Sequence, residues 1–583
     1  MQGDRGSKIN FMQTRFRIPL LAIVFLLILA SCTKTNKQGK VVPENAAFAV
    51  HIDGGSLSAK LPWNEVKQNV MFREMYADSS IPVFVKKALD NPDNSGIDTK
   101  SDLVFFAQKD TLGGIVALTG TVKDAEKFKL FCIDLTDGGS QTDKDGVSFI
   151  SRAPMCVGWN KEKFLFIMNE PALGSGNAMY HNGDPAYTPK SRDLLVSCKN
   201  LFDLKESNSL GENEKFTTLV KKTGDIHFWV NTEELTKSGF ANSNLAMISL
   251  NKLFEGSVTA ATLNFENGKI VVDAKSYASK ELTELYKKYG GKTIDEAMIM
   301  RLPSKDVAAV FAMSFKPEGI KELLKILGVE GLANIGLTNM GLGFTMEDFI
   351  KANKGDILFA VTDIKEKKDS IKFKGMNGEA KGFAKNSIQP DIIFATSIAD
   401  KDAFNLLIKA GTKLGGSIKG GDSTMPSFLD KFGYNTNDKY FAIGNSKENI
   451  EKYLAGNGNN NFDFLSKING NPFGGYINFQ FILKALESNF SKDSSTKIIY
   501  DASLKMWDNI YIKGGNYEDG GTTKSIEINL MDKNTNSLKQ LNQYLGLLGK
   551  QKMESHKRLK LSDANIEEIK KDPAFKVPPP PSK

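Results

Sequence analysis

Two of the four histidines stand where a general base could act. His51 is followed two residues later by Asp53, and alternate residues of a strand share one face, so the carboxylate could orient the imidazole. His227 lies in a second, aromatic strand expected over residues 226–230. Because no nucleophile or third ligand follows either residue at a fixed spacing, we predict two satisfied structural histidines.

The segment from Asn91 to Asp102 places side-chain oxygens at alternating positions, with Gly96 sixth, as in a calcium-binding loop. Asp93, Ser95 and Asp102 are the candidate metal ligands. The first position is Asn instead of Asp, and the twelfth is Asp instead of the longer, bidentate Glu. We therefore predict a helix-to-strand turn here, with no metal and no cofactor.

The four tryptophans could in principle form a face for stacking sugars. They are Trp63, Trp159, Trp229 and Trp507. Trp229 alternates with apolar neighbours in an expected strand, and Trp63 begins an apolar stripe with Val66 and Val70. These patterns favour core packing over a sugar-stacking face.

Cys32 carries the clearest chemical signal in the chain. It follows Leu29, Ala30 and Ser31 as in a lipobox, whose cysteine is diacylated and becomes the new N-terminus after cleavage. The preceding apolar run, Ile18–Ala30, is shorter than the roughly 20 residues that span a bilayer. With Arg15 and Arg17 before it, this run has the pattern of a secretory signal.

The sequence predicts export and anchoring in the cell envelope, in the outer membrane. Residues 1–31 form the signal peptide, and its charged region reads better from Met12, in which case residues 1–11 are an artefact of gene prediction. Residues 32–40 form a polar, lipid-anchored tether. Two or three acyl chains hold a protein stably, so the membrane is a permanent partner.

The composition is that of an ordinary globular protein. Of 583 residues, 41% are hydrophobic and 25% charged, and the net charge of +8 leaves no concentrated positive surface for nucleic acid. Beyond Cys32 there are three cysteines, Cys132, Cys156 and Cys198, without a CxxC pair. At least one is expected to be unpaired unless it bonds to another chain, and a bridge between Cys132 and Cys156 stays open.

The chain repeats itself with an offset of roughly 250–275 residues, and four segments recur in the same order. The matched pairs are Pro43–Val50 with Pro303–Met313, Lys100–Ala107 with Lys354–Val361, Gly120–Phe128 with Thr396–Phe404, and Leu263–Val272 with Gly515–Gly520. The last pair contains Asn267–Gly268 and Asp519–Gly520, which predict type I′ hairpin turns with positive φ at both central residues.

The repeat predicts an α+β fold of two homologous halves, each made of antiparallel hairpins with packed helices. The halves are expected over residues 41–295 and 296–550, and a flexible tail over 551–583. The offset drifts between them, so we predict long surface loops over 365–389 and 415–423.

The lipobox, the Pro-x-x-Ala strand start at Pro43 and the turn Ser95–Asp98 before a strand resemble an uncharacterised lipoprotein family of Bacteroidetes with a domain of unknown function. The resemblance implies export and anchoring, and it brings no catalytic residues. We expect a non-enzymatic binding or scaffolding protein whose partner is an envelope protein or a glycan. The alternative is an envelope hydrolase with a site assembled from distant residues.

Replacement of Cys32 by Ala is expected to leave an unprocessed or soluble precursor, because the thiol is the only acyl acceptor at the cleavage site. Metabolic labelling with palmitate measures this directly. Label that persists in the Cys32→Ala protein would contradict the anchoring prediction.

Overall fold

The computed structural model describes residues 39–78, 81–110, 112–170, 192–237, 250–374, 380–418, 432–458, 460–490 and 494–571. Cys32, the predicted signal segment and most of the tether lie outside these residues.

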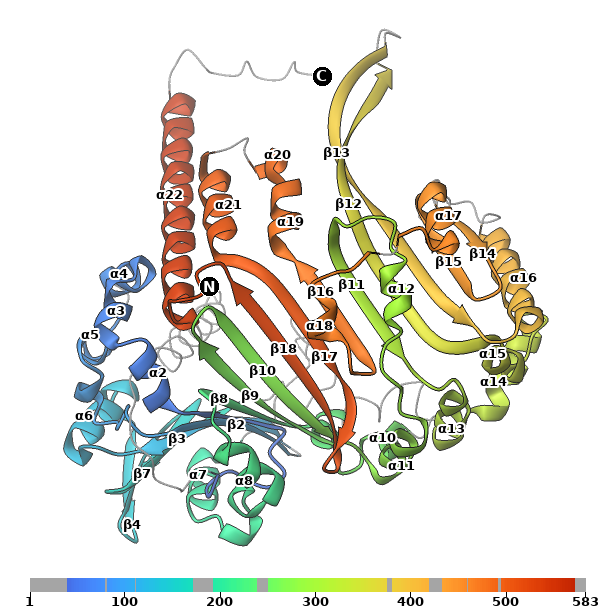
Figure 1. The fold of residues 1–583 in the computed structure, drawn as a ribbon. Helices are drawn as coiled ribbons and strands as arrows, with labels where there is room; N and C mark the ends of the chain where they lie inside the picture. The colour runs from blue at the N-terminus through green and yellow to red at the C-terminus, as the bar shows by residue number, and fades with distance from the viewer. Residues whose placement is uncertain are drawn as a thin grey trace, which may run out of the picture.

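One 18-stranded antiparallel sheet runs through the described residues (Figure 1). The first part, in spatial order, consists of β4 (Ser140–Lys144), β5 (Val147–Arg152), β6 (Met155–Trp159), β7 (Lys163–Asn169), β3 (Gly113–Thr121), β2 (Leu103–Asp110), β1 (Phe48–Ile52), β8 (Ile226–Asn231), β9 (Val258–Glu266) and β10 (Lys269–Tyr277). The sheet continues from β10 into β18 (Gly521–Leu530), β17 (Trp507–Glu518), β16 (Phe473–Asn478), β11 (Val307–Ser314), β12 (Asn353–Lys374), β13 (Ala380–Ile398), β15 (Tyr440–Gly444) and β14 (Gly433–Thr436).

Helices fill the connections between strands, so the α+β class predicted from the sequence is confirmed. In the first part they are α2 (Gly54–Lys60), α3 (Trp63–Gln68), α4 (Val70–Ala77), α5 (Val83–Asp90), α6 (Ala125–Leu135), α7 (Leu194–Phe202), α8 (Glu214–Lys221), α9 (Thr232–Thr236), α10 (Leu250–Phe254) and α11 (Lys280–Tyr289). In the second part they are α12 (Glu296–Met300), α13 (Glu318–Ile326), α14 (Glu330–Asn339), α15 (Met346–Ala352), α16 (Lys401–Ile418), α17 (Lys447–Ala455), α18 (Leu465–Ile468), α19 (Phe479–Ala485), α20 (Glu487–Phe490), α21 (Ser494–Met506) and α22 (Ser537–Lys571). Three short 3-10 turns, η1 (Pro92–Ser95), η3 (Glu206–Asn208) and η4 (Leu210–Glu212), complete the first part. In the described part of the chain, no helix combines the length and apolar character needed to cross a membrane.

The first part of the sheet has a core on each face. Successive side chains of a strand point to opposite faces, so both sets are buried. In β2, Leu103 packs in the core beneath α2 to α6, whereas Val104 and Phe106 pack in the core beneath α7 and α8. This double burial explains why β2 reads as a continuous apolar run instead of an alternating one.

Outward from the β10–β18 pair, the strands follow an equivalent order over eight strands in each direction, and β5 and β4 extend the first part alone. β1 lies between β2 and β8, and β11 lies between β12 and β16. We call the β10–β18 pair the central seam. At its middle Asp273 lies opposite Ser525, and the register continues evenly to both ends.

The last helix of each part packs on helices of the other part (Figure 1). α22 lies beside α4, and Asn69 Nδ2, at the start of α4, donates to Asn542 O at 2.6 Å. α11 packs against α13 so closely that a Cβ on Gly319 would lie 2.9 Å from the Cβ of Tyr289. The two parts are therefore joined by helices as well as by the central seam.

Three local predictions are wrong. The surface loop predicted over 365–389 instead extends the β12–β13 hairpin, in which Lys365 pairs with Gln389. The tail predicted from 551 begins inside α22, which continues to Lys571. Positive φ at both turn residues occurs at Asp519 (44°) and Gly520 (82°), but in the other hairpin only at Gly268 (69°), because Asn267 forms a β-bridge with Asn536. Pairing of backbone groups accounts for the extended hairpin and for the Asn267 turn. The tail becomes helical because an established helix extends easily by one residue at a time.

A buried carboxylate ties α2 to the sheet. Asp225 is fully buried just before β8, and Lys60 Nζ of α2 donates to both of its oxygens at 2.7 Å. Ser56 Oγ also donates to this carboxylate, and the backbone N–H of Phe265 donates to its Oδ2 at 2.6 Å. These bonds let the charge stay in the core, where an unpaired carboxylate would be strongly unfavourable.

Substitution of Asp225 by Ala is expected to lower the free energy of unfolding by about 3–5 kcal/mol, because it leaves the Lys60 ammonium and the Phe265 N–H without their buried partner. Urea denaturation followed by circular dichroism measures the loss. Asp438→Ala, which breaks an exposed pair with Lys401, serves as the control and is expected to cost less than about 1 kcal/mol. Equal effects of the two substitutions would contradict the role given to Asp225.

Candidate functional site

His51 in β1 and His227 in β8 meet in the core between the two strands. The strands pair His51 with His227, both side chains are buried, and their Nδ1 atoms lie 2.9 Å apart. Nε2 of His227 donates to the carbonyl of Lys222 at 3.0 Å, so its Nδ1 accepts from the Nδ1–H of His51. The two histidines that the sequence singled out separately thus form one buried pair.

Asp53 does not orient His51, because its Oδ1 accepts from the backbone N–H of Ser56 and caps α2. Asp102 is the carboxylate beside the pair, with Oδ2 3.6 Å from His51 Nε2, and it lines a cleft of about 510 Å³. Burial, followed by the charge of His51, lowers the pKa of His227. Beyond His227, the next hydrogen-bond partner is the backbone carbonyl of Lys222, which cannot take up a proton. The two histidines therefore form a structural hydrogen bond in the core.

The three candidate metal ligands are engaged separately. Asp93 Oδ2 accepts from Lys123 Nζ at 2.7 Å, Ser95 Oγ donates to Pro92 O at 2.7 Å, and Asp102 faces His51. Among the described residues, no group of three or more His, Cys, Asp or Glu side chains could hold a metal ion. The loop forms the 3-10 turn η1 and leads into β2.

Cys132, Cys156 and Cys198 are buried free thiols, so the bridge left open between Cys132 and Cys156 is not formed. Burial raises the pKa of the Cys132 thiol, and a hydrogen bond with Cys156 together with burial raises that of Cys198. Cys132 and Cys198 therefore resist ionisation and are poor nucleophiles, whereas the hydrogen bond with Cys198 lowers the pKa of the buried Cys156 thiol. Cys32, the predicted lipidation site, lies outside the described residues.

Trp159 and Trp229 are buried, which confirms the prediction of core packing for these two residues. The rings of Trp229 and Phe216 are perpendicular, with centroids 5.8 Å apart, and Trp229 is 2% exposed, so its face is not available for stacking a sugar. Among the described residues, however, its Nε1–H has no hydrogen-bond partner. By contrast, Nε1 of Trp63 donates to the carbonyl of Leu89 at 3.0 Å.

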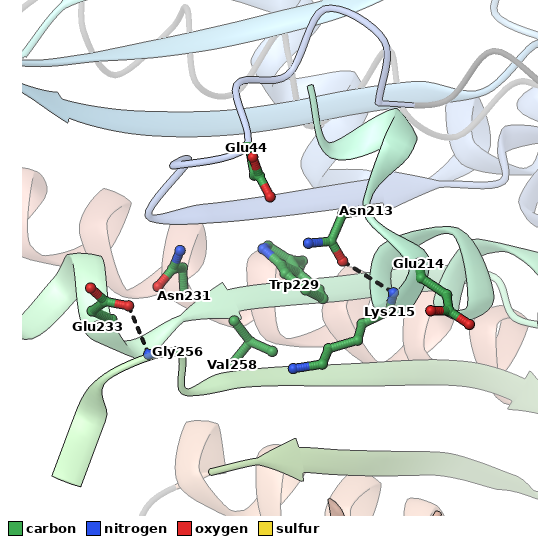
Figure 2. Close-up of a pocket in the computed structure, with 9 residues that line it drawn as sticks. All are labelled: Glu44, Asn213, Glu214, Lys215, Trp229, Asn231, Glu233, Gly256 and Val258. Carbon is green, nitrogen blue, oxygen red and sulfur yellow. Dashed lines mark hydrogen bonds between the residues drawn. The ribbon is translucent and has the colours of Figure 1, made fainter. Parts of the chain in front are cut away.

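Trp229 lines a pocket of about 300 Å³, most of whose lining residues are charged or amide side chains, between the chain before β1, the start of α8 and the end of β8 (Figure 2). In Figure 2 its indole nitrogen lies on the side of the ring that faces Glu44 and Asn231. Asn213, Lys215 and other residues complete the lining. We call this space the Trp229 pocket, and it is the candidate site.

The two asparagines of the pocket are helix N-caps. Asn213 Oδ1 accepts from the backbone N–H groups of Lys215 and Phe216 at the start of α8, and Asn231 Oδ1 accepts from that of Glu234 in α9. Because capping occupies the carbonyl oxygens, each amide is left with its NH₂ group as a donor. The pocket therefore combines three N–H donor groups, one of them on a buried indole.

Carboxylates surround these donors. Glu44 and Glu214 are exposed, and Glu233 accepts from the backbone N–H of Gly256 at 2.8 Å, which lowers the pKa of Glu233. Lys215 lies over the ring of Tyr277, 4.7 Å from its centroid. The lining is thus acidic overall, with acceptors and donors interleaved.

Sequence reasoning placed Trp229 in the core and missed the pocket. The available signal was weak: an asparagine precedes a helix at positions 213 and 231, which predicts a cap and says nothing of where the amide nitrogen points. Only the fold brings residue 44 and residues 213–258 together around one space.

Comparisons with known proteins give a family and little else. No curated protein matches the sequence. A solved structure, crystal form I of TP0453, is similar over 43% of this chain and 80% of that chain, at 12% identity and a TM-score of 0.23. Residues 39–374, more than half of the chain, match the domain of unknown function DUF4836. The chain therefore belongs to the DUF4836 family.

Proposed function

We propose that this protein is a cell-envelope lipoprotein that binds a small polar ligand and performs no chemistry on it. The observation that carries the binding role is the buried Nε1–H of Trp229, which lines the polar pocket and lacks an acceptor among the described residues. A buried donor without a partner costs about 1–3 kcal/mol, and a ligand oxygen would remove that cost. The lipobox at Cys32 supports anchoring, in the outer membrane of a member of the Bacteroidetes.

The proposal includes an internal duplication, with a boundary near residues 295 and 296. The repeated strand order on both sides of the central seam supports it, as does the exchange of helices α11 and α22. Two related halves that pair through equivalent strands form a self-complementary contact, as in a two-fold dimer. The result is one continuous platform that holds the pocket at a fixed place.

The two halves differ at the site. Asn231 caps α9 and Asn478 caps α19. If these two caps are equivalent, the position in the second half that corresponds to Trp229 is Tyr476. Tyr476 stacks on Phe464 with ring centroids 4.4 Å apart, and His227 corresponds to Gly474. A binding role would thus belong to the first half, with the second half in support.

The alternative is a hydrolase that uses the buried histidine pair with Asp102 beside the 510 Å³ cleft. Its specific support is the His51 Nε2 atom, which has no hydrogen-bond partner among the described residues. Against it, the innermost contact of the pair is the Lys222 carbonyl, which can take no proton.

His51→Ala and His227→Ala are each expected to lower the free energy of unfolding by about 1–3 kcal/mol, because each leaves a buried ring nitrogen without its partner. Ligand binding, measured where both variants are folded, should be unchanged. A variant that keeps its Tm and loses an envelope activity would favour the hydrolase instead.

The same pair should make the protein sensitive to acid. Because the pKa of His227 is lowered in the folded state, its contribution to stability is present above about pH 6.5 and is lost as pH falls below that value. His227→Ala should therefore lose less stability than the parent protein on acidification, which urea denaturation at several pH values can measure.

Ligand binding at the pocket can be followed by fluorine NMR after the four tryptophans are replaced by 5-fluorotryptophan. Trp229→Phe identifies the Trp229 resonance, and Trp507, in the second half, serves as the control. We expect one class among sugars, amino acids, peptides and nucleosides to shift the Trp229 resonance alone. If no class shifts it, the binding proposal fails, and a scaffolding role is the remaining non-enzymatic function.

A further inference from the structure

The Trp229 pocket continues into a second polar space. An adjoining pocket of about 380 Å³ shares Glu44 and Asn231 with it, and also contains Asn45, Asn208 and Glu234. We call the two together the asparagine groove. The two adjoining volumes favour a ligand of more than one unit.

Both pockets of the groove offer amide NH₂ groups as hydrogen-bond donors. Asn45 Oδ1 accepts from Gln108 Nε2 at 2.9 Å, and Asn208 Oδ1 accepts from Ser207 Oγ at 3.4 Å. As at Asn213 and Asn231, the amide oxygens are occupied inside the protein, which leaves NH₂ donors for a ligand. Carboxylates line the same two pockets as these amides.

Hydroxyl groups match this lining best, because each hydroxyl can accept from an amide and donate to a carboxylate. Lys237 forms ion pairs with Glu233 and Glu234 at 3.0 and 2.6 Å, but Glu44 and Glu214 still outnumber Lys215 in the two linings. The remaining negative charge disfavours an anionic ligand. A peptide with bulky side chains would find few large apolar side chains to pack against, since Val258 and Trp229 are the ones among the residues lining the two pockets.

We infer that the asparagine groove binds a neutral oligosaccharide, recognised by hydrogen bonds to its hydroxyl groups and not by stacking on an aromatic face. The inference rests on the proposed binding function and names its ligand class. Trp229 contributes its buried Nε1–H as a donor to one sugar oxygen. The edge-on contact of its ring with Phe216 keeps that donor in place.

Isothermal titration calorimetry of the full chain with neutral hexasaccharides of glucose, mannose and N-acetylglucosamine tests the inference. Asn213→Asp and Asn231→Asp keep the oxygen that caps the helix and remove the NH₂ donor, so both variants should fold. Each is expected to weaken binding about 3- to 10-fold, the loss of one hydrogen bond. Trp229→Phe should weaken it by a similar factor.

Asn478→Asp is the matched control, because Asn478 caps α19 in the same way and lines neither pocket of the groove. It should leave the affinity unchanged. If all variants bind the hexasaccharides with equal affinity, the ligand does not bind in the asparagine groove. A hexuronic acid oligomer that binds as tightly as the neutral sugars would overturn the charge argument.

A hexapeptide of alanine separates the two proposals. Tight peptide binding that the same variants abolish would overturn the sugar class and leave ligand binding at the pocket intact. If no hexasaccharide binds while another class shifts the Trp229 fluorine resonance, the inference alone fails. If no class shifts that resonance, both proposals fail.

Discussion

The antiparallel pairing of β10 with β18 is the contact on which the rest of the structure depends. Without it the sheet would end in two long edge strands, each with a row of unpaired backbone groups. The central seam satisfies these groups and places Asp273 opposite Ser525 at its middle. Lys269 adds an ion pair across the seam with Glu527 at 3.0 Å. Because α22 then reaches the helices of the first part, the cores of both parts depend on this one register.

The first part of the sheet buries several polar and charged side chains, among them Asp225, His51 and His227. Asp225 is stabilised by Lys60 and a backbone N–H, and the histidine pair is stabilised by its own hydrogen bond. Trp229, on the same face of the sheet as His227, differs in having no partner for its N–H among the described residues. Among the described residues of this part, the Nε1 atom of Trp229 and the Nε2 atom of His51 are the buried side-chain nitrogens without a hydrogen-bond partner. Both are informative, since buried polar groups are almost always paired.

The asparagines of the groove connect fold to binding. A helix cap needs an oxygen that accepts from the first backbone N–H groups, and asparagine supplies one while keeping two N–H donors. Asn213 and Asn231 therefore stabilise α8 and α9 and present donors to the pocket at the same time. Their orientation is fixed by the caps, which reduces the entropy that a ligand must overcome.

The sequence by itself determined several elements and their kinds. The strand at 103–110 follows from an apolar run entered from a polar turn, and the hairpins at 267–268 and 519–520 follow from their turn residues. The core position of Trp229 follows from its alternation with apolar neighbours. The sequence could not determine that β10 pairs with β18, that His51 meets His227, or that residues 365–389 pair with each other. These contacts join segments far apart in the chain or depend on backbone groups, which every residue carries and no side-chain pattern reveals. The pocket belongs to the same class, because its donors become a site only where three separate segments close around one space.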